Sequence, residues 1–528
     1  MKIYFTLLSL LAFQCFSQDS TYILDHNSVA ARLMDNGMLF QNVSSGTAAY
    51  SVPKDSLTTV IFSSSIWIGA TDLQGNLHMA ALRYASGEDF FSGPYSTNNS
   101  YNDSLYLQKY DQSIWAVTRA EINFHMANYW TPGYVPVPSI ANWPGNGDVS
   151  LGVVSNLAPF VDMNSDNIYN PLDGDYPDVR GDEAAYIILN DSKGIHTETN
   201  GEPLGIEVHI MASQYASTDF LDSTTFLNIR VFNRGVQLYS NVKFGLFMDG
   251  DIGNYADDYF GCAPNKDMMY FYNGDMNDES DGGKVGYGLN PPAVGVVSLS
   301  KLMTASGFFT STGNFPYSDP QTASQYWNFM SAQWANGSPW TYGGLGYPSS
   351  TGGSNSPTNF MFDGNPLTGV AWSEVTNNNP MGDRRGIMVM QTTSIFPDEM
   401  SCYDMAVIYS RSGGTNLQNV QSLMETADSV KQFYIDQVTY NCNQVTAETK
   451  EIIENDFSIY PNPSTGNVFI ESPIDYDLSI YDFHGRLIQA VSNQSFEKSV
   501  ELNLTQGVYL FEFETITGKI TRKVIITD

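Results

Sequence analysis

Runs of apolar and alternating hydrophobic and polar residues recur along the chain up to about residue 410. The clearest of these strand-like runs are residues 58–62, 66–69, 226–232, 240–248, 386–391 and 405–410. Clusters of Gly, Asn, Ser and Pro separate the runs, as in all-β domains with long loops. We therefore expect an all-β dominated body, folded as a large β-sandwich with long loops.

One strong helical pattern follows these runs. Apolar side chains recur at helical spacing at Leu417, Val420, Met424, Ala427, Val430 and Tyr434. The tetrapeptide Thr415-Asn416-Leu417-Gln418 at their start resembles a capping box. The spacing predicts one helix at the C-terminal end of the body, with its apolar face turned toward the core.

A long segment without regular periodicity occupies residues 311–359. It is rich in Gly, Ser, Asn and Pro, and it contains the aromatic residues Trp327, Trp334, Trp340, Tyr342 and Tyr347. Loops of this length are usually functional or are fixed by their own side chains. The aromatic rings either anchor the loop or stack on sugar rings, and we favour anchoring.

The last 73 residues, 456–528, have a different pattern. Short alternating strands are separated by Pro, Asn and Gly, which predicts a small β-sandwich. At residues 507–513, alternation places Val508 and Leu510 on one face and Tyr509, Phe511 and Phe513 on the other. This segment also contains three distinctive motifs: Tyr460-Pro461-Asn462-Pro463, His484-Gly485-Arg486 and Gly507-Val508-Tyr509.

Together these motifs resemble the type A C-terminal sorting domain of proteins exported by the type IX secretion system of Bacteroidota. The resemblance implies an Ig-like fold, recognition by the secretion machinery, and release from the cell or attachment to a surface glycolipid. Residues 28–40, 65–77 and 382–385 are similar to a large group of Bacteroidota type IX cargo proteins. That second resemblance carries no activity to transfer to the body.

The N-terminus has the order of a secretory signal peptide at residues 1–17. Lys2 precedes an apolar stretch at 3–13, and small residues stand at Cys15 and Ser17. We expect a body at 18–440, with a break into two subdomains considered near 150–180, and a polar linker at 441–455. No later apolar run approaches the roughly 20 residues needed to cross a bilayer. The expected location is therefore outside the cell or on its outer surface, without a transmembrane helix.

The composition narrows the choice of partners. The 528 residues include 56 acidic and 24 basic side chains, for a net charge of −32, which argues against nucleic-acid binding. The 42% hydrophobic and 13% aromatic content argues against a disordered chain.

Beyond the leader, Cys262, Cys402 and Cys442 permit one disulfide and one free thiol, and a Cys402–Cys442 bond would link the two ends of the predicted helix.

Oxygen ligands are spaced along residues 162–173 as in a short calcium-binding loop. The ligand positions are Asp162, Asn164, Asp166, Ile168 through its carbonyl, Asn170 and Asp173. The segment resembles EF-hand and dockerin-type loops, with Asn167 where Gly is usual and Asp173 where Glu is usual. Asn tolerates the left-handed backbone that this turn requires. We expect a structural calcium ion here, and the alternative is a loop of Asx turns without metal.

Other acidic clusters are weaker candidates for metal binding or catalysis. Asp249, Asp251, Asp257 and Asp258 follow an apolar strand, whereas Asp275, Asn277, Asp278 and Asp281 form a polar loop. For both groups we favour solvated loops over metal sites. Glu207 and His209 share one strand face, and with His196, Glu198 and Glu202 they form the one group suited to acid–base chemistry. A polar outer strand face explains this group equally well.

The sequence lacks the His-Glu-x-x-His, Gly-x-Ser-x-Gly, Walker-type and Cys-x-x-Cys motifs. We therefore favour a non-catalytic extracellular role in adhesion, surface structure or glycan binding, and designate no catalytic residues. The alternative is a secreted polysaccharide hydrolase, because a pair of carboxylates needs no sequence signature. Its candidate carboxylates are Glu198, Glu202, Glu207 and Asp249.

Overall fold

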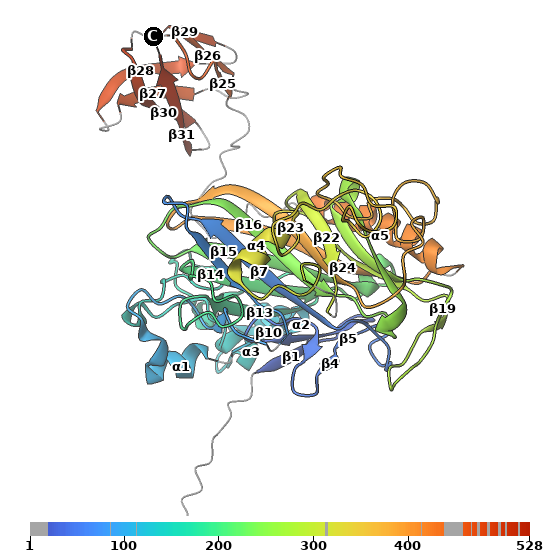
Figure 1. Cartoon of the computed structure of the whole chain (residues 1–528). Helices are drawn as coiled ribbons and strands as arrows, with labels where there is room; N and C mark the ends of the chain where they lie inside the picture. Colours follow the sequence, from blue (N-terminus) through green and yellow to red (C-terminus); the bar gives the residue numbers. More distant parts are fainter. Residues whose placement is uncertain are drawn as a thin grey trace, which may run out of the picture. The chain divides into compact units, whose positions relative to one another are not determined.

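The computed structural model describes residues 20–437, except 85, 112, 312–314 and 413, and residues 458–527, except 466, 472–475, 483–485, 495–497, 502–503 and 516–517. The chain forms two compact units, the body at 1–442 and the tail unit at 443–528 (Figure 1). The expected leader at 1–17 and linker at 441–455 lie outside the described residues. Among the described helices, none is both long and apolar enough to cross a membrane.

The body contains two large antiparallel sheets. The strands of the larger one are β9 (Phe91–Ser92), β10 (Trp115–Thr118), β13 (Glu183–Asn190), β14 (Ile206–Gln214), β15 (Thr224–Asn233), β17 (Asp258–Ala263), β18 (Met268–Asn273), β21 (Ala293–Ser298) and β24 (Met400–Ser410). Their order is β10-β13-β14-β15-β24-β21-β18-β17, with β9 also paired to β13. The second sheet consists of β7 (Ser63–Thr71), β8 (Leu77–Ala81), β16 (Tyr239–Asp249), β22 (Met303–Phe309) and β23 (Arg385–Ile395). Its order is β22-β23-β16-β7-β8.

Smaller sheets complete the body. Four short strands form one sheet in the order β1 (Thr21–Leu24), β2 (Ala30–Met34), β5 (Tyr50–Ser51) and β6 (Thr59–Ile61). The two-stranded pairs are β3 (Gln41–Asn42) with β4 (Thr47–Ala48), β11 (Phe160–Val161) with β12 (Tyr176–Pro177), and β19 (Asn277–Asp278) with β20 (Gly288–Leu289). These additions leave the two large sheets as the main layers of the body.

The main core lies between the two large sheets. The Phe244 ring of β16 stacks on the Tyr403 ring of β24, with centroids 4.1 Å apart. In β13, Ala185, Ile187 and Leu189 belong to this core, whereas the intervening residues belong to a second cluster on the opposite face. Such period-2 alternation, with both faces covered, makes the strand hydrophobic throughout. The predicted all-β sandwich is confirmed.

Helices pack on both large sheets: α5 covers part of the outer face of the larger sheet, and α4 packs on β8 of the five-stranded sheet. The predicted C-terminal helix is α5 (Asn416–Asp436), and the Thr415 side chain accepts the Gln418 backbone N–H at its start. Val420, Leu423 and other apolar residues of α5 pack on β18, β21 and β24. The short helices α1 (Ser104–Tyr110), α2 (Arg119–Asn128), α3 (Pro138–Ala141) and α4 (Ala323–Phe329) were not predicted, although the capping box of Thr118 and Glu121 marks the start of α2.

The aromatic residues of the long loop are mostly interior. Trp334 and Trp340 are buried in the main core, where the Trp334 ring packs against Phe329 and Phe308. The Tyr347 ring stacks on a second tyrosine ring, with centroids 4.1 Å apart. Burial of these large rings fixes the loop, so anchoring, which we favoured from the sequence, is their role in the fold.

The cysteines differ in state. Cys402 is disulfide-bonded, and Cys262 is a buried free thiol. Cys442, the partner considered for Cys402, lies outside the described residues. The described cysteines thus agree with one disulfide and one free thiol.

The tail unit is a small sandwich of two sheets. One sheet has the order β25 (Ser458–Tyr460), β26 (Asn467–Glu471) and β29 (Lys498–Glu501). The other has the order β28 (Leu487–Gln494), β27 (Tyr476–Asp482), β30 (Gly507–Thr515) and β31 (Gly518–Ile526). In β30, Tyr509, Phe511 and Phe513 are buried, whereas Val508 and Leu510 are exposed, which confirms the predicted alternation.

The Tyr-Pro-Asn-Pro motif connects the beginning of the tail unit to its last strand. The Asn462 side chain donates to the Lys523 carbonyl at 2.8 Å and accepts the Ile525 backbone N–H at 2.9 Å. The Ser464 backbone N–H also donates to the Ile525 carbonyl. The motif therefore has a definite structural role, because it closes the sandwich onto β31.

Candidate functional site

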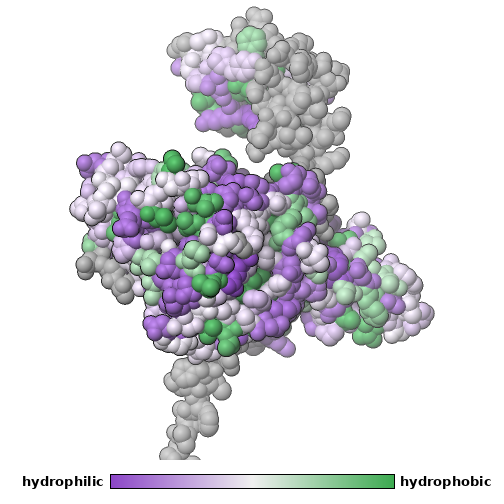
Figure 2. All heavy atoms as spheres, turned by 90° about the vertical axis from the view of Figure 1, so that its right-hand side faces the viewer, coloured by the Kyte–Doolittle hydropathy of each residue, from purple (hydrophilic) through white to green (hydrophobic). Residues whose placement is uncertain are grey.

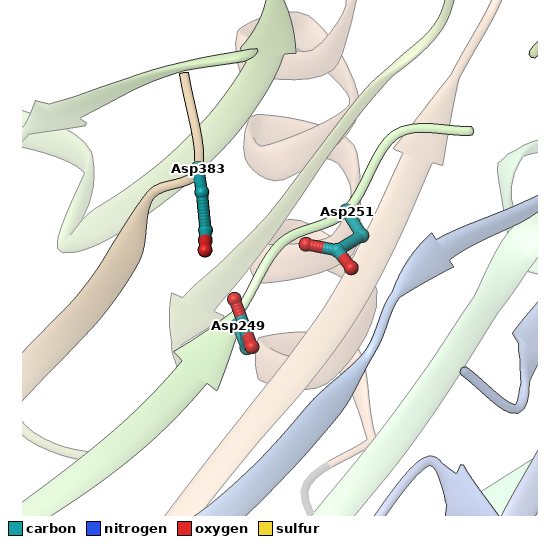
Figure 3. Close-up of side chains that lie close together, drawn as sticks. All are labelled: Asp249, Asp251 and Asp383. Carbon is teal, nitrogen blue, oxygen red and sulfur yellow. The ribbon is translucent and has the colours of Figure 1, made fainter. Parts of the chain in front are cut away.

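Three carboxylates from two neighbouring strands meet at one end of the five-stranded sheet. Asp249 is the last residue of β16, Asp251 lies two residues after it, and Asp383 lies two residues before the start of β23 at Arg385. β16 and β23 pair with Asp249 opposite Arg385, so the pairing brings both acidic segments together. One oxygen atom of each carboxylate lies within 4.8 Å of the other two (Figure 3). We call these three residues the buried acidic cluster.

Two of the three carboxylates are buried with incomplete hydrogen bonding. Asp249 is 2% exposed and Asp251 is 8% exposed. The Tyr84 hydroxyl donates to Asp249 Oδ2 at 2.6 Å, whereas Asp249 Oδ1 has no hydrogen-bond partner among the described residues. The Asp251 carboxylate makes no hydrogen bond or ion pair within that part of the chain. Buried carboxylates are ordinarily paired or hydrogen-bonded, so these two are unusual.

The guanidinium group of Arg385 lies beside the cluster. It forms ion pairs of 2.9 Å with Asp383 and 3.5 Å with Asp249, and its Nε atom lies 3.6 Å from Asp319. Arg385 Nε also donates to the Tyr84 hydroxyl. One cation is therefore shared among three carboxylates and cannot neutralise them all.

A second arginine extends the network of ion pairs. Arg83 lies 2.6 Å from Asp319 and 3.3 Å from Glu198. The Tyr326 and Ser86 hydroxyls also donate to Glu198. The network, including the cluster, contains five carboxylates and two guanidinium groups: Asp249, Asp251, Asp319, Asp383 and Glu198 with Arg83 and Arg385.

The environment of the cluster favours the uncharged form of Asp249 and Asp251. Burial raises the pKa of Asp249 to about 7, against the opposing influence of the Arg385 guanidinium. Burial and the neighbouring Asp249 carboxylate raise the pKa of Asp251 well above its usual value. Such a group of oxygen atoms attracts either protons or a hard cation such as calcium or magnesium.

The loop predicted to bind calcium lies on the surface and stabilises its first carboxylate with the backbone. Asp162 Oδ1 accepts the N–H groups of Asn164 and Ser165, and its Oδ2 accepts that of Asn167 at 2.7 Å. Asn167 has φ of 60°, so it takes the left-handed conformation expected from its place in the loop. Asp166 in turn accepts the N–H group of Ile168 at 2.8 Å.

The second half of the loop is held in the same way. Asp173 accepts a hydrogen bond of 2.6 Å from the Asn170 side-chain amide. The buried Asp175 accepts the Met163 and Asn170 backbone N–H groups, each at 2.8 Å. Among the described residues, Asp162 and the other loop carboxylates are not brought together as closely as those of the buried acidic cluster. Calcium binding by this loop stays a prediction.

The group suited to acid–base chemistry is brought together only in part. Glu207 and His209 share a face of β14, with Nε2 3.1 Å from Oε1, and Arg234 lies 2.8 Å from the same carboxylate. Burial raises the pKa of Glu207, but the hydrogen bond from His209 and the charge of Arg234 lower it overall to about 2. His196 is buried elsewhere between two backbone carbonyls, and Glu202 is exposed.

The remaining acidic residues form no second site of this kind among the described residues. Asp278 accepts the backbone N–H groups of Tyr287 and Asn254, and the Ile252 N–H donates to Asp258 Oδ2. Burial and Asp278 raise the pKa of Asp257 to about 7. These acids differ from the solvated loop expected from the sequence, because Asp258 and Asp278 are buried.

Comparison with known proteins assigns the tail unit. Residues 458–527 match the family model described as a secretion system C-terminal sorting domain. This match supports a type IX secretion cargo protein. Its tail unit is the sorting domain expected from the motifs, and it implies interaction with the secretion machinery and export from the cell.

The other comparisons are less informative about the body. No curated protein matches the sequence. A solved polysaccharide lyase is 9% identical, with 61% of this chain and 34% of that chain covered and a TM-score of 0.18. An Escherichia coli K12 protein provisionally named an aldose 1-epimerase is 8% identical, with coverages of 75% and 100% and a TM-score of 0.24. The chain thus spans about a third of the lyase, and both scores are too low to assign a fold or activity.

Sequence reasoning identified part of the buried acidic cluster. The Asp249-Gly250-Asp251 segment was a weak candidate, but Asp383 was not joined to it. The Gly382-Asp383-Arg384-Arg385 stretch was noted only as a family similarity. The two acidic segments are joined by the pairing of β16 with β23, which places Asp249 opposite Arg385.

Proposed function

We propose that the body acts outside the cell as a non-catalytic protein that binds glycans or surface components. The sorting domain supports export, followed by release or attachment to the cell surface. The observation that carries the non-catalytic part is the state of the candidate carboxylates: Glu198 and Glu207 are buried and paired with arginines, and Asp249 is buried.

The hydrolase alternative requires a different arrangement. A glycoside hydrolase uses two carboxylates about 5–10 Å apart on either side of an accessible sugar. Glu207 instead accepts hydrogen bonds from Arg234 and from the Tyr95 backbone, and Glu198 accepts them from Tyr326 and Ser86. These partners hold both side chains inside the body, and Glu202 is the one exposed member of the candidate set.

An aromatic surface on the body supports the glycan ligand. Figure 2 shows one face of the molecule, where hydrophobic residues form small patches among hydrophilic ones. Phe124 is 53% exposed and Trp130 is 64% exposed, and their rings contact Tyr134 and Tyr129 respectively. We call these four residues the aromatic surface. Exposed flat rings of this type offer apolar faces on which a sugar can stack.

A panel of soluble polysaccharides tests this proposal with the full chain. We expect retardation by at least one polysaccharide in affinity electrophoresis, without release of reducing ends. The double variant Phe124→Ala/Trp130→Ala should weaken binding by at least about tenfold, because aromatic residues commonly carry 1.4 kcal/mol or more of a binding energy. Phe396→Ala removes an exposed aromatic residue elsewhere and should bind normally. Release of sugar products would instead support the hydrolase.

The surface loop at residues 162–173 is proposed to bind a structural calcium ion. Support comes from its ligand spacing and from the left-handed Asn167, which gives the loop a sharp turn. Chelation should lower the melting temperature of the full chain, and Asp162→Ala should lower it while reducing the effect of chelation. The exposed Asp428 offers the control variant Asp428→Asn, which should keep the full calcium effect. Equal calcium effects in the two variants would reject the loop as a site.

The export route has its own test. Deleting residues 456–528 removes the sorting domain without touching the described residues of the body. We expect the shortened chain to stay in the periplasm, as judged by fractionation and immunoblotting. Its appearance in the medium at the level of the full chain would reject the assignment of the tail unit as the export signal.

A further inference from the structure

The buried acidic cluster has charges that the surrounding protein leaves uncompensated. Asp251 is more than nine-tenths buried, and its carboxylate has no hydrogen bond or ion pair within the described residues. Asp249 Oδ1 is likewise without a hydrogen bond there. Burying an ionised carboxylate is costly unless a partner or a metal ion compensates it. Both unpartnered groups belong to the same cluster (Figure 3).

The neighbouring side chains do not supply the missing positive charge. Five carboxylates in the network share Arg83 and Arg385, which leaves three negative charges when all the acids are ionised (5 − 2 = 3). Lys284 influences Asp251 electrostatically, but it forms no ion pair with any described carboxylate. A single divalent cation would reduce the excess to one negative charge.

The backbone holds the cluster in place. Asp249 pairs with Arg385 on one side and with Ser63 of β7 on the other, so its position is fixed by two strands. A Cβ atom at Gly250 would collide with the Phe271 ring, which shows how closely this turn is packed. The site is therefore formed by the fold itself, and binding requires little rearrangement.

We propose that Asp249, Asp251 and Asp383 together bind one hard divalent cation at the end of the five-stranded sheet. Oxygen-only ligands select calcium, magnesium or manganese over softer metals. Three carboxylates already held together favour calcium, because magnesium retains several waters and accepts fewer protein ligands. The site is separate from the surface loop at 162–173, and its existence does not depend on that loop.

Calorimetric titration and thermal melting of the full chain test the site. The Asp162→Ala variant serves as the parent, so that the surface loop does not contribute. Calcium chloride should bind this parent with one site and raise its melting temperature relative to EDTA. Adding Asp251→Asn should weaken binding by at least about tenfold, a loss seen even for residues that only support metal ligands. Adding Asp257→Asn, which changes a nearby acid outside the cluster, should leave binding unchanged.

Other outcomes decide the proposal as clearly. Tighter binding of magnesium chloride that Asp251→Asn removes supports the site and assigns it to magnesium. Absence of binding by the parent with either salt overturns the proposal, as does binding that Asp251→Asn leaves intact. If Asp251→Asn does not fold, Asp383→Asn replaces it, because the Asp383 side chain is 26% exposed and tolerates the change more readily.

Discussion

The surface loop at residues 162–173 and the buried acidic cluster both gather carboxylates, but they stabilise them differently. In the loop, Asp162 accepts three backbone N–H groups, and the neighbouring Asp175 accepts two more. In the cluster, Asp251 has no such donor among the described residues, and Asp249 receives a hydroxyl and a distant guanidinium. The loop is thus supported by residues close in sequence, whereas the cluster depends on other strands.

This contrast distinguishes two kinds of acidic segment. Spacing such as Asp-x-Asn-x-Asp describes a loop that orders itself through Asx turns, with or without a cation. Burial together with missing donors describes a site whose charge must be compensated from outside the protein. The second property is visible only after the strands are paired, and it is the stronger indication of a ligand.

The largest expected loss of stability comes from replacing Arg385, and it measures how far the cluster depends on this residue. Arg385→Met leaves the adjacent buried carboxylates without a guanidinium, and breaking buried ion pairs costs about 3–5 kcal/mol. Urea denaturation of the full chain, followed through the body transition, measures the loss. Lys109→Met removes a pair that is partly exposed and should cost at most about 1 kcal/mol. Similar losses of stability in both variants would show that the buried acidic cluster depends on Arg385 no more than the partly exposed pair depends on Lys109.

A smaller loss of stability is expected from replacing Asp175, the buried residue beside the surface loop. Asp175→Ala leaves the backbone N–H groups of Met163 and Asn170 without their acceptor, at a cost of about 1–3 kcal/mol. Amide hydrogen exchange at these two residues should accelerate as well. Compared in EDTA, so that calcium does not contribute, Asp173→Ala removes an exposed carboxylate of the same loop and should change stability less. A greater loss for Asp173→Ala would contradict the role given to Asp175.

The conformation of Asn167 predicts a still smaller change. Asn167→Ala places an ordinary side chain at φ of 60° and should cost about 1 kcal/mol. Asn167→Gly should be close to neutral, because glycine adopts this backbone region freely. Thermal melting in EDTA compares the two variants without any contribution from a metal. Equal stability of the Ala and Gly variants would show that the turn has relaxed.

The pH dependence of stability should differ in sign between buried and exposed acids. Burial raises the pKa of Asp257 to about 7 from 3.8, so between these values the folded body holds a proton that the unfolded chain releases. Its contribution to stability is present below pH 3.8 and is lost as pH rises through about 7. Asp257→Asn should flatten the melting temperature over this range, with a small effect because the residue is about half buried.

Asp162 provides the opposite case. Burial is the largest single influence and raises the pKa of Asp162, but the backbone hydrogen bonds together outweigh it and lower the pKa. The stabilising contribution of Asp162 is therefore present above pH 3.8 and is lost in acid. Asp162→Asn should therefore reduce the acid-induced loss of stability, measured in EDTA. A profile in which Asp257→Asn and Asp162→Asn act in the same pH range would remove the distinction between the two regions.

Local patterns explain why much of the fold was accessible from the sequence. Alternation over residues 226–232 identified β15, and the apolar spacing from Leu417 to Tyr434 identified α5. In β30, Phe511 and Phe513 are buried as the alternation required. Each of these signals depends on neighbours within a few residues, so no knowledge of the strand order was needed.

The site was less accessible because its residues are distant in the chain. Asp251 and Asp383 are separated by 132 positions (383 − 251), and only the pairing of β16 with β23 joins them. Trp334 and Trp340 fall in an irregular segment, so their burial was an inference from ring size alone. The helices α1 and α3 are short, and tertiary packing rather than periodicity stabilises helices of this length.

The link from Asn462 to Lys523 and Ile525 sets an order of events during synthesis. A growing polypeptide cannot close the sorting domain until β31 has left the ribosome, by which time the whole body has been made. Prematurely terminated products lack the partners of Asn462, so their sorting domain is incomplete. Folding of the sorting domain is therefore completed only after the body has been synthesised.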